Sequence, residues 1–309
     1  MTTQPQCLGH KEVLHLDPEA GRSRLRDETA KQASSGQQAR TRALVIPREH
    51  GAWGLLFVPL FTGVAAGIAS VHRIGPLLLF TAATFFLFWL RTPLESLAGS
   101  GVITAHTRDE RRVAWLASLI LAAASVFCLA VLLWGGRNSR LVHIGLFAAL
   151  ALAIQTALRR LGRPMRMVSQ VAGAVALTAT APAAYYIGSG RLGNAALALW
   201  IANWCFAWNQ IHFVQLRIHA GRASGIGEKF AEGKYFFAGQ VLLVAALLAA
   251  SLSRLVPALV IVAFIPALVR GTYWFVRAPR PLNVRKLGWS ELRQGIAFGI
   301  LLAAAFLIH

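Results

Sequence analysis

The densest set of side chains able to bind a ligand or move a proton lies between residues 203 and 219. Its members are Asn203, Asn209, Gln210, His212, Gln215, Arg217 and His219. On a helix that turns about 100° per residue, Asn203, Gln210 and Arg217 share one stripe, and the other four spread over a second stripe. A helix that is polar on two stripes cannot face lipid, so we expect it inside the protein, lining a binding site.

These polar groups also have a simpler interpretation. Asn, Gln and His form hydrogen bonds between membrane helices, each worth about 0.6 kcal/mol, and such bonds need no ligand. Seven polar groups towards one end of a helix exceed what packing requires. The pattern therefore favours a site over packing contacts alone.

A second cluster precedes the first apolar stretch. It places a guanidinium, a carboxylate and an imidazole in consecutive positions, at Arg48, Glu49 and His50, followed by Trp53. Histidine changes charge near neutral pH, so acid–base chemistry is one interpretation. The other is an anchor at the membrane surface, where Arg contacts headgroups and Trp sets the depth.

Two further clusters each contain a carboxylate. Arg91 and Glu95 are four residues apart, so a helix places them on one face, and Pro93 between them favours a kink. A cavity wall and a simple ion pair at a helix end are the two interpretations. Glu291 is expected in the first turn of a helix that begins near position 290, where the helix dipole favours an acid. Capping is the leading explanation for Glu291, and a place in a polar site is the alternative.

The elements that must position these groups are membrane helices. A hydrocarbon core about 30 Å thick requires roughly 20 apolar residues of helix, and lipid offers the backbone no hydrogen-bond partners. Nine apolar stretches fit: 52–70, 74–98, 112–134, 141–158, 166–188, 193–217, 235–253, 255–276 and 290–308. The sequence predicts an all-α, polytopic membrane protein of about nine transmembrane helices.

Positive charge alternates between the connections of these helices. The chain has 31 Lys and Arg against 12 Asp and Glu, a net charge of +19. With flanking residues included, the even-numbered connections hold 17 Lys and Arg, and the odd-numbered ones hold five. The positive-inside rule therefore predicts a cytoplasmic N-terminus and a C-terminus outside. The same rule explains the basic excess, so no nucleic-acid partner is expected.

The N-terminal segment differs in composition from the rest. Residues 1–43 are polar with no sustained apolar face, which predicts a disordered, basic cytoplasmic tail before a transmembrane domain over 44–309. The three cysteines lack metal-binding spacing, so no metal site is predicted. The pair Gly63 and Gly67 favours close packing of helices within one bundle. In the predicted orientation all four polar clusters lie on the cytoplasmic side, which predicts one polar cavity open to the cytoplasm.

Three motifs resemble those of a known family. PREHGAW at the first span, RTPLES near the end of the second and LGWSEL before the last are similar to the YwiC-like family of bacterial integral membrane proteins. The resemblance covers roughly 44–309 and implies a bacterial cytoplasmic membrane. It implies no particular activity, because the family has none firmly established.

A more distant resemblance is to the UbiA-type prenyltransferases. Those enzymes have nine membrane helices and a cytoplasmic active site at the ends of spans two and six, and QIHF at 210–213 is similar to a Gln-x-Pro-His-Phe stretch of their haem-farnesylating branch. They hold Mg²⁺ and a prenyl diphosphate with two Asp-rich motifs. Here span two ends with Glu95 alone, span six has no acid, and Asp109 and Glu110 lie in a loop among arginines. A standard Mg²⁺–diphosphate mechanism is therefore not implied.

Three classes of function follow. The first is an enzyme or binding protein for an isoprenoid or lipid on a UbiA-like scaffold without the Asp-rich Mg²⁺ site. Arg48, Arg91 and Arg217 would meet an anionic head, and Glu49, His50 or His212 would act as acid or base. The second is a small-molecule transporter, and the third is a structural partner in the membrane. The sequence names no cofactor and leaves open whether the protein is an enzyme.

Overall fold

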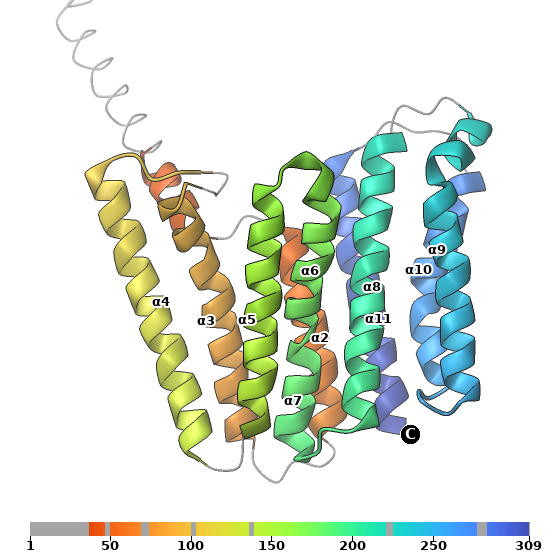
Figure 1. Cartoon of the computed structure of the whole chain (residues 1–309), viewed down its shortest axis with the longest axis horizontal. Helices are drawn as coiled ribbons and strands as arrows, with labels where there is room; N and C mark the ends of the chain where they lie inside the picture. The colour runs from red at the N-terminus through yellow and green to blue at the C-terminus, as the bar shows by residue number, and fades with distance from the viewer. Residues whose placement is uncertain are drawn as a thin grey trace, which may run out of the picture. The chain divides into compact units, whose positions relative to one another are not determined.

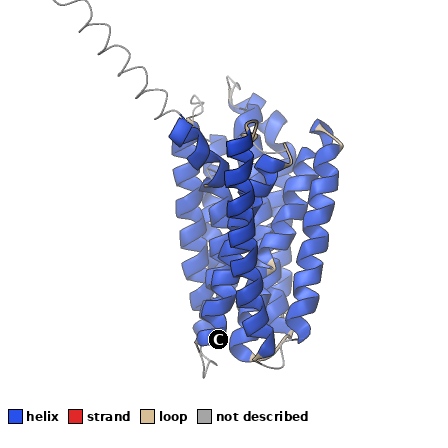
Figure 2. Ribbon diagram, turned by 90° about the vertical axis from the view of Figure 1, so that its left-hand side faces the viewer, coloured by secondary structure: helices blue, strands red, loops and turns tan. Residues whose placement is uncertain are grey.

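The structure, a computed structural model, describes residues 37–46, 50–68, 74–99, 103–135, 139–220, 225–276 and 283–308. Every regular element in these ranges is a helix (Figure 2). The chain falls into two compact units. The first contains Met1–Ile46 and Thr92–Ala117, and the second contains Pro47–Arg91 and Ser118–His309.

The first unit is organised around the start of one long helix. Helix α3 (Gly75–Leu97) ends in this unit and α4 (Arg108–Trp134) begins in it. The Thr107 hydroxyl accepts a bond from the Glu110 backbone N–H, and the Glu110 carboxylate accepts bonds from the backbone N–H groups of Thr107 and His106. This reciprocal arrangement is a capping box. Asp109 and Glu110 therefore belong to the first turn of α4, and their predicted placement in a loop is wrong.

The same carboxylate ties the N-terminal part of the chain to α4. A helix over 37–45 places the Arg40 guanidinium 2.6 Å from Glu110, and Leu44 on this helix is fully buried. The helix includes the last seven residues of the predicted tail. The rest of that tail lies outside the described residues, so its predicted disorder stays a prediction.

The second unit is a bundle of helices (Figure 1). Besides parts of α3 and α4 it contains α2 (His50–Ile68), α5 (Ser139–Arg160), α6 (Arg166–Thr178), α7 (Thr180–Ser189), α8 (Asn194–His219), α9 (Ile226–Leu252), α10 (Leu259–Val276) and α11 (Val284–Ile308). Each predicted span coincides with one helix, except that α6 and α7 share one span. They meet at Ala179, three residues before Pro182, and Ala179 itself keeps right-handed helical dihedral angles.

Seven of these segments are long and apolar enough to cross a membrane. They are α3, α4, α5, the α6–α7 pair, α9, α10 and most of α11. Side chains such as Leu119, Ile120 and Phe127 of α4 are about two-thirds exposed, as expected of groups that contact lipid. The chain is therefore an all-α, polytopic membrane protein. The apolar part of α2 is shorter and α8 is interrupted by polar residues, so nine crossings remain a prediction.

Helices α2 and α7 pack with almost no space between their backbones. A Cβ atom at Gly63 would meet the Ala181 backbone, and one at Gly67 would meet Tyr185. A Cβ at Gly188 would meet Gly67 in turn. The prediction that Gly63 and Gly67 serve close packing within the bundle is confirmed.

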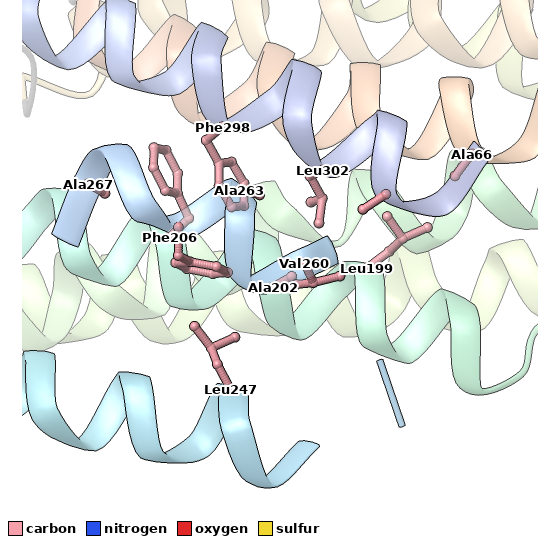
Figure 3. Close-up of a cluster of buried hydrophobic side chains, with 12 residues drawn as sticks. Ala66, Leu199, Ala202, Phe206, Leu247, Val260, Ala263, Ala267, Phe298 and Leu302 are labelled. Atoms are coloured by element: carbon pink, nitrogen blue, oxygen red, sulfur yellow. The ribbon is translucent and has the colours of Figure 1, made fainter. Parts of the chain in front are cut away.

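A buried apolar cluster joins the C-terminal helices (Figure 3). The rings of Phe206 on α8 and Phe298 on α11 stack with centroids 3.9 Å apart, and Phe264 of α10 meets Phe298 edge-on. Ala202 of α8 and Ala263 of α10 are buried in the same cluster. The cluster fixes α8, α10 and α11 against one another, and the polar groups described next lie on the same three helices.

Candidate functional site

The most unusual feature of the bundle is a charged pair inside it. The guanidinium of Arg270 on α10 forms an ion pair with the carboxylate of Glu291 on α11, and the two side chains are only 11% and 12% exposed. The Arg270 guanidinium also lies 4.1 Å from the ring centroid of Phe213 on α8. Ionisable groups inside a membrane protein are costly to bury, so such a pair marks a candidate site.

The structure corrects the prediction for Glu291. Helix α11 begins at Val284, so Glu291 lies about two turns inside it and cannot cap its first turn. The carboxylate instead neutralises Arg270 on the neighbouring helix. The expected start near residue 290 is wrong because residues 284–289, which include Arg285, Lys286 and Gly288, already belong to the helix.

Gln210 of α8 completes the contact of the three helices. Its amide Nε2 donates to the backbone oxygen of Glu291 over 3.0 Å. The bond runs from one stripe of the predicted polar helix to the residue that carries the buried carboxylate. Two of the predicted site residues, Gln210 and Glu291, are thus brought together.

Unsatisfied polar atoms gather on the same part of the chain. Among the residues described, nine buried side-chain atoms have no hydrogen-bond partner: Asn203 Oδ1, Trp204 Nε1, Asn209 Nδ2 and Oδ1, Gln240 Oε1, Arg270 Nε and Nη2, Glu291 Oε2 and Gln294 Oε1. All nine belong to α8–α11. Buried polar atoms in proteins are nearly always paired, so this concentration is typical of a region that binds water or a ligand.

Several other predicted residues of α8 make packing contacts. Asn203 donates to the Thr62 hydroxyl on α2 over 3.0 Å, and Gln215 donates to Gln170 on α6 over 3.0 Å. Asn209 is 5% exposed, and both of its amide atoms lack partners. The packing interpretation therefore accounts for Gln215 and for the Asn203 Nδ2 group, and it leaves Asn203 Oδ1 and Asn209 unexplained.

Two further predicted residues of α8 are half-buried near its end. The centroids of the His212 and Trp208 rings lie 5.6 Å apart. Arg217 lies within electrostatic range of Lys229 on α9 and of Glu291. Arg217 therefore approaches the buried pair, whereas no described contact joins His212 to it.

The PREHGAW cluster is described only in part. Arg48 and Glu49 lie outside the described residues, as does the side chain of His50, the first residue of α2. Trp53 is half-buried, and its ring contacts those of Phe57, Phe85 and Phe88 at 4.8–5.6 Å between centroids. This packing against α3 is more than a surface anchor requires.

Arg91 and Glu95 are both half-buried on α3. The helix continues through the buried Pro93 as far as Leu97. Arg91 belongs to the second unit and Glu95 to the first. Their predicted ion pair stays a prediction.

The sequence reasoning missed two buried cations. Arg270 lies inside the predicted apolar stretch 255–276, and a cation at such a position is itself a signal of a site. Lys229 of α9 is 3% exposed, and its ammonium donates to the Trp274 backbone oxygen over 3.1 Å and lies 4.8 Å from the Trp274 ring centroid. Lys229 lies before the predicted apolar span, so the hydropathy pattern gave no reason to bury it.

The pair has no metal cluster around it in the part of the chain that the structure describes. Over the described ranges, no three or more His, Cys, Asp or Glu side chains are grouped to hold a metal ion. A surface hollow of about 560 Å³ is lined by Gln37, Gln38, Thr41 and Arg42, and it contains none of the predicted site residues. The predicted polar cavity therefore remains a prediction.

Fold and site together define a polytopic helical membrane protein with a buried ion pair and unpaired polar groups between its C-terminal helices. Residues 46–185 match the model of a family described as YwiC-like protein. The match covers somewhat less than half of the chain, from α2 to α7, and the Arg270–Glu291 pair lies beyond it. Neither the curated proteins nor the solved structures gave a match.

Proposed function

We propose that this chain is a YwiC-like membrane protein over its whole transmembrane domain, and that it binds the polar head of an isoprenoid or lipid between α8, α10 and α11. The observation that carries the proposal is the buried Arg270–Glu291 pair with unpartnered polar atoms on both side chains. A ligand head with hydrogen-bonding groups would satisfy these atoms. Its apolar tail would lie among helices that already face lipid.

A UbiA-like arrangement is part of the same proposal. It includes nine crossings, a cytoplasmic N-terminus, an outer C-terminus and a bacterial cytoplasmic membrane. The correspondence between nine predicted spans and the observed helices supports it. So do the polar groups near the end of α8.

The Mg²⁺–diphosphate chemistry of that superfamily does not fit these residues. Magnesium is held mainly by carboxylates and phosphates. Helix α8 has no acid, and Glu291 is paired with a guanidinium. No reaction step through Mg²⁺ is therefore proposed, and acid or base roles for Glu49, His50 and His212 remain predictions.

The proposal is tested by thermal unfolding of the purified protein in phosphatidylcholine nanodiscs, with a panel of isoprenoids and lipids. A ligand at one hundred times its dissociation constant stabilises the folded state by about 2.7 kcal/mol, which is readily measured. We expect stabilisation by at least one amphiphile, and loss of that effect when Arg270 and Glu291 are both replaced by Gln. A flat panel would contradict the proposal.

Transport is the second candidate, because buried ion pairs also occur along substrate paths in membrane proteins. The same Arg270–Glu291 pair is the observation in its favour. Uptake of small molecules into proteoliposomes distinguishes transport from the binding of an isoprenoid or lipid. Uptake that requires Glu291, with no stabilisation by any amphiphile, would favour transport.

A further inference from the structure

One end of the bundle carries most of the charge of α8–α11. It is the end at which α8 and α10 finish and α9 and α11 begin, and we call it the α8–α9 end (Figure 1). The charged residues described there are seven basic ones, Arg217, Lys229, Lys234, Arg270, Arg285, Lys286 and Arg293, and three acids, Glu228, Glu232 and Glu291. The excess of positive charge predicts an anionic partner.

Exposed basic residues at a helix end are explained by the positive-inside rule, without any ligand. That rule does not explain charged side chains that are buried or half-buried. Four charged residues at this end are not exposed, and each of the four helices contributes one: Arg217, Lys229, Arg270 and Glu291. Three of the four are cations, although a low-dielectric interior favours balanced charge.

The hydrogen bonds of Arg270 show which of its donor nitrogens lack an acceptor. Its Nη1 donates to Glu291, whereas Nε and Nη2 are buried without a partner. These two nitrogens form the side edge of the guanidinium, where two parallel N–H bonds point the same way. A guanidinium can only donate, and this edge matches the two oxygens of a phosphate or carboxylate.

We propose that the α8–α9 end binds an oxyanion, the phosphate or carboxylate of an amphiphile, directly on the Nε–Nη2 edge of Arg270. Lys229 and Arg217 supply further positive charge, and Glu291 is a positioning residue that holds the guanidinium. No divalent cation takes part, because these groups are mostly cations whereas a magnesium site needs carboxylates. The inference rests on the proposed binding of an isoprenoid or lipid and names the charge of its head.

The test compares two ligands with the same tail. Binding of farnesyl phosphate and of farnesol is measured on the full chain in phosphatidylcholine nanodiscs, with EDTA present, and inorganic phosphate is tested as a competitor. We expect farnesyl phosphate to bind at least about tenfold more tightly than farnesol, because a bidentate charged pair strengthens only the phosphate complex. Inorganic phosphate should compete weakly, because it has no tail to place among the helices.

Variants locate the effect. Arg270→Gln alone leaves Glu291 buried without its partner, so the double variant Arg270→Gln, Glu291→Gln removes both charges together. The double variant should lose at least about tenfold in affinity for farnesyl phosphate and keep its affinity for farnesol. The matched control is Arg293→Gln, because Arg293 is an exposed arginine on α11, the helix that carries Glu291. This variant should bind both ligands as the unchanged protein does.

The outcomes separate the two proposals. Equal affinity for farnesol and farnesyl phosphate would overturn the oxyanion inference and leave amphiphile binding intact. A requirement for Mg²⁺ would overturn direct binding by Arg270. Competition by inorganic phosphate at the affinity of farnesyl phosphate would support an oxyanion site but contradict its lipid source. If no amphiphile binds the unchanged protein, the proposed function itself fails.

Discussion

At the scale of single residues, Arg270 and Glu291 depend on each other. Each side chain is nearly nine-tenths buried, and each would be an isolated charge without the other. A buried ion pair contributes little net stability, because the cost of removing both charges from water offsets their attraction. Removing only one partner is strongly destabilising, because it leaves the other charge buried and unpaired. The pair is therefore explained by function better than by stability.

This argument predicts the outcome of a double-mutant cycle. Glu291→Gln alone should lower the free energy of unfolding by about 3 kcal/mol, because it leaves a buried guanidinium unpaired. The double variant with Arg270→Gln should lie within about 1 kcal/mol of the unchanged protein. Chemical denaturation in mixed micelles, followed by circular dichroism, measures the free energy of unfolding of the two single variants and of the double variant. Additive effects of the two single variants would show that the side chains do not interact.

At the scale of elements, the contact between α2 and α7 depends on the absence of side chains. Gly63→Ala should lower the free energy of unfolding by about 2 kcal/mol, because the new methyl group meets the Ala181 backbone and the helices must separate. Gly145→Ala on α5 is the matched control, since nothing lies within 4 Å of its added Cβ. That control should stabilise the protein by up to about 1 kcal/mol. Equal effects of the two substitutions would contradict the close approach.

The start of α4 depends on its capping box. Thr107→Ala removes the oxygen that accepts the Glu110 backbone N–H and should cost about 1 kcal/mol of local stability. Thr107→Ser keeps that oxygen and should behave as the unchanged protein does. Hydrogen exchange of the backbone amides at 108–112 gives the readout. Protection that is unaltered by the alanine would argue against the cap.

At the scale of the whole molecule, the described helices establish a membrane protein, and its orientation is a prediction from charge. Leu161, between α5 and α6, and Leu192, between α7 and α8, are both accessible and are separated by one span. In a variant without native cysteines, Leu192→Cys should react with an impermeant maleimide in intact spheroplasts. Leu161→Cys should react only after permeabilisation. The reverse pattern would invert the predicted orientation.

Much of the fold was predictable because hydropathy is a local property. Every predicted apolar stretch became a helix, since lipid leaves the backbone no alternative to internal hydrogen bonds. The capping box at Thr107–Glu110 was equally local, as a Thr followed three residues later by Glu, and was overlooked among the neighbouring arginines. Helical spacing predicted that polar residues near the end of α8 point into the protein, and one of them, Gln210, contacts α11.

The sequence by itself determined that the chain is a helical membrane protein and roughly which residues form its helices. Only the tertiary structure decided that Glu291 pairs with Arg270 instead of capping α11, and that Lys229 is buried beside Trp274. The physical reason is that helix formation in lipid depends on neighbours along the chain. The partner of a buried charge depends on which helix faces lie together, and packing of side chains from distant segments sets those faces.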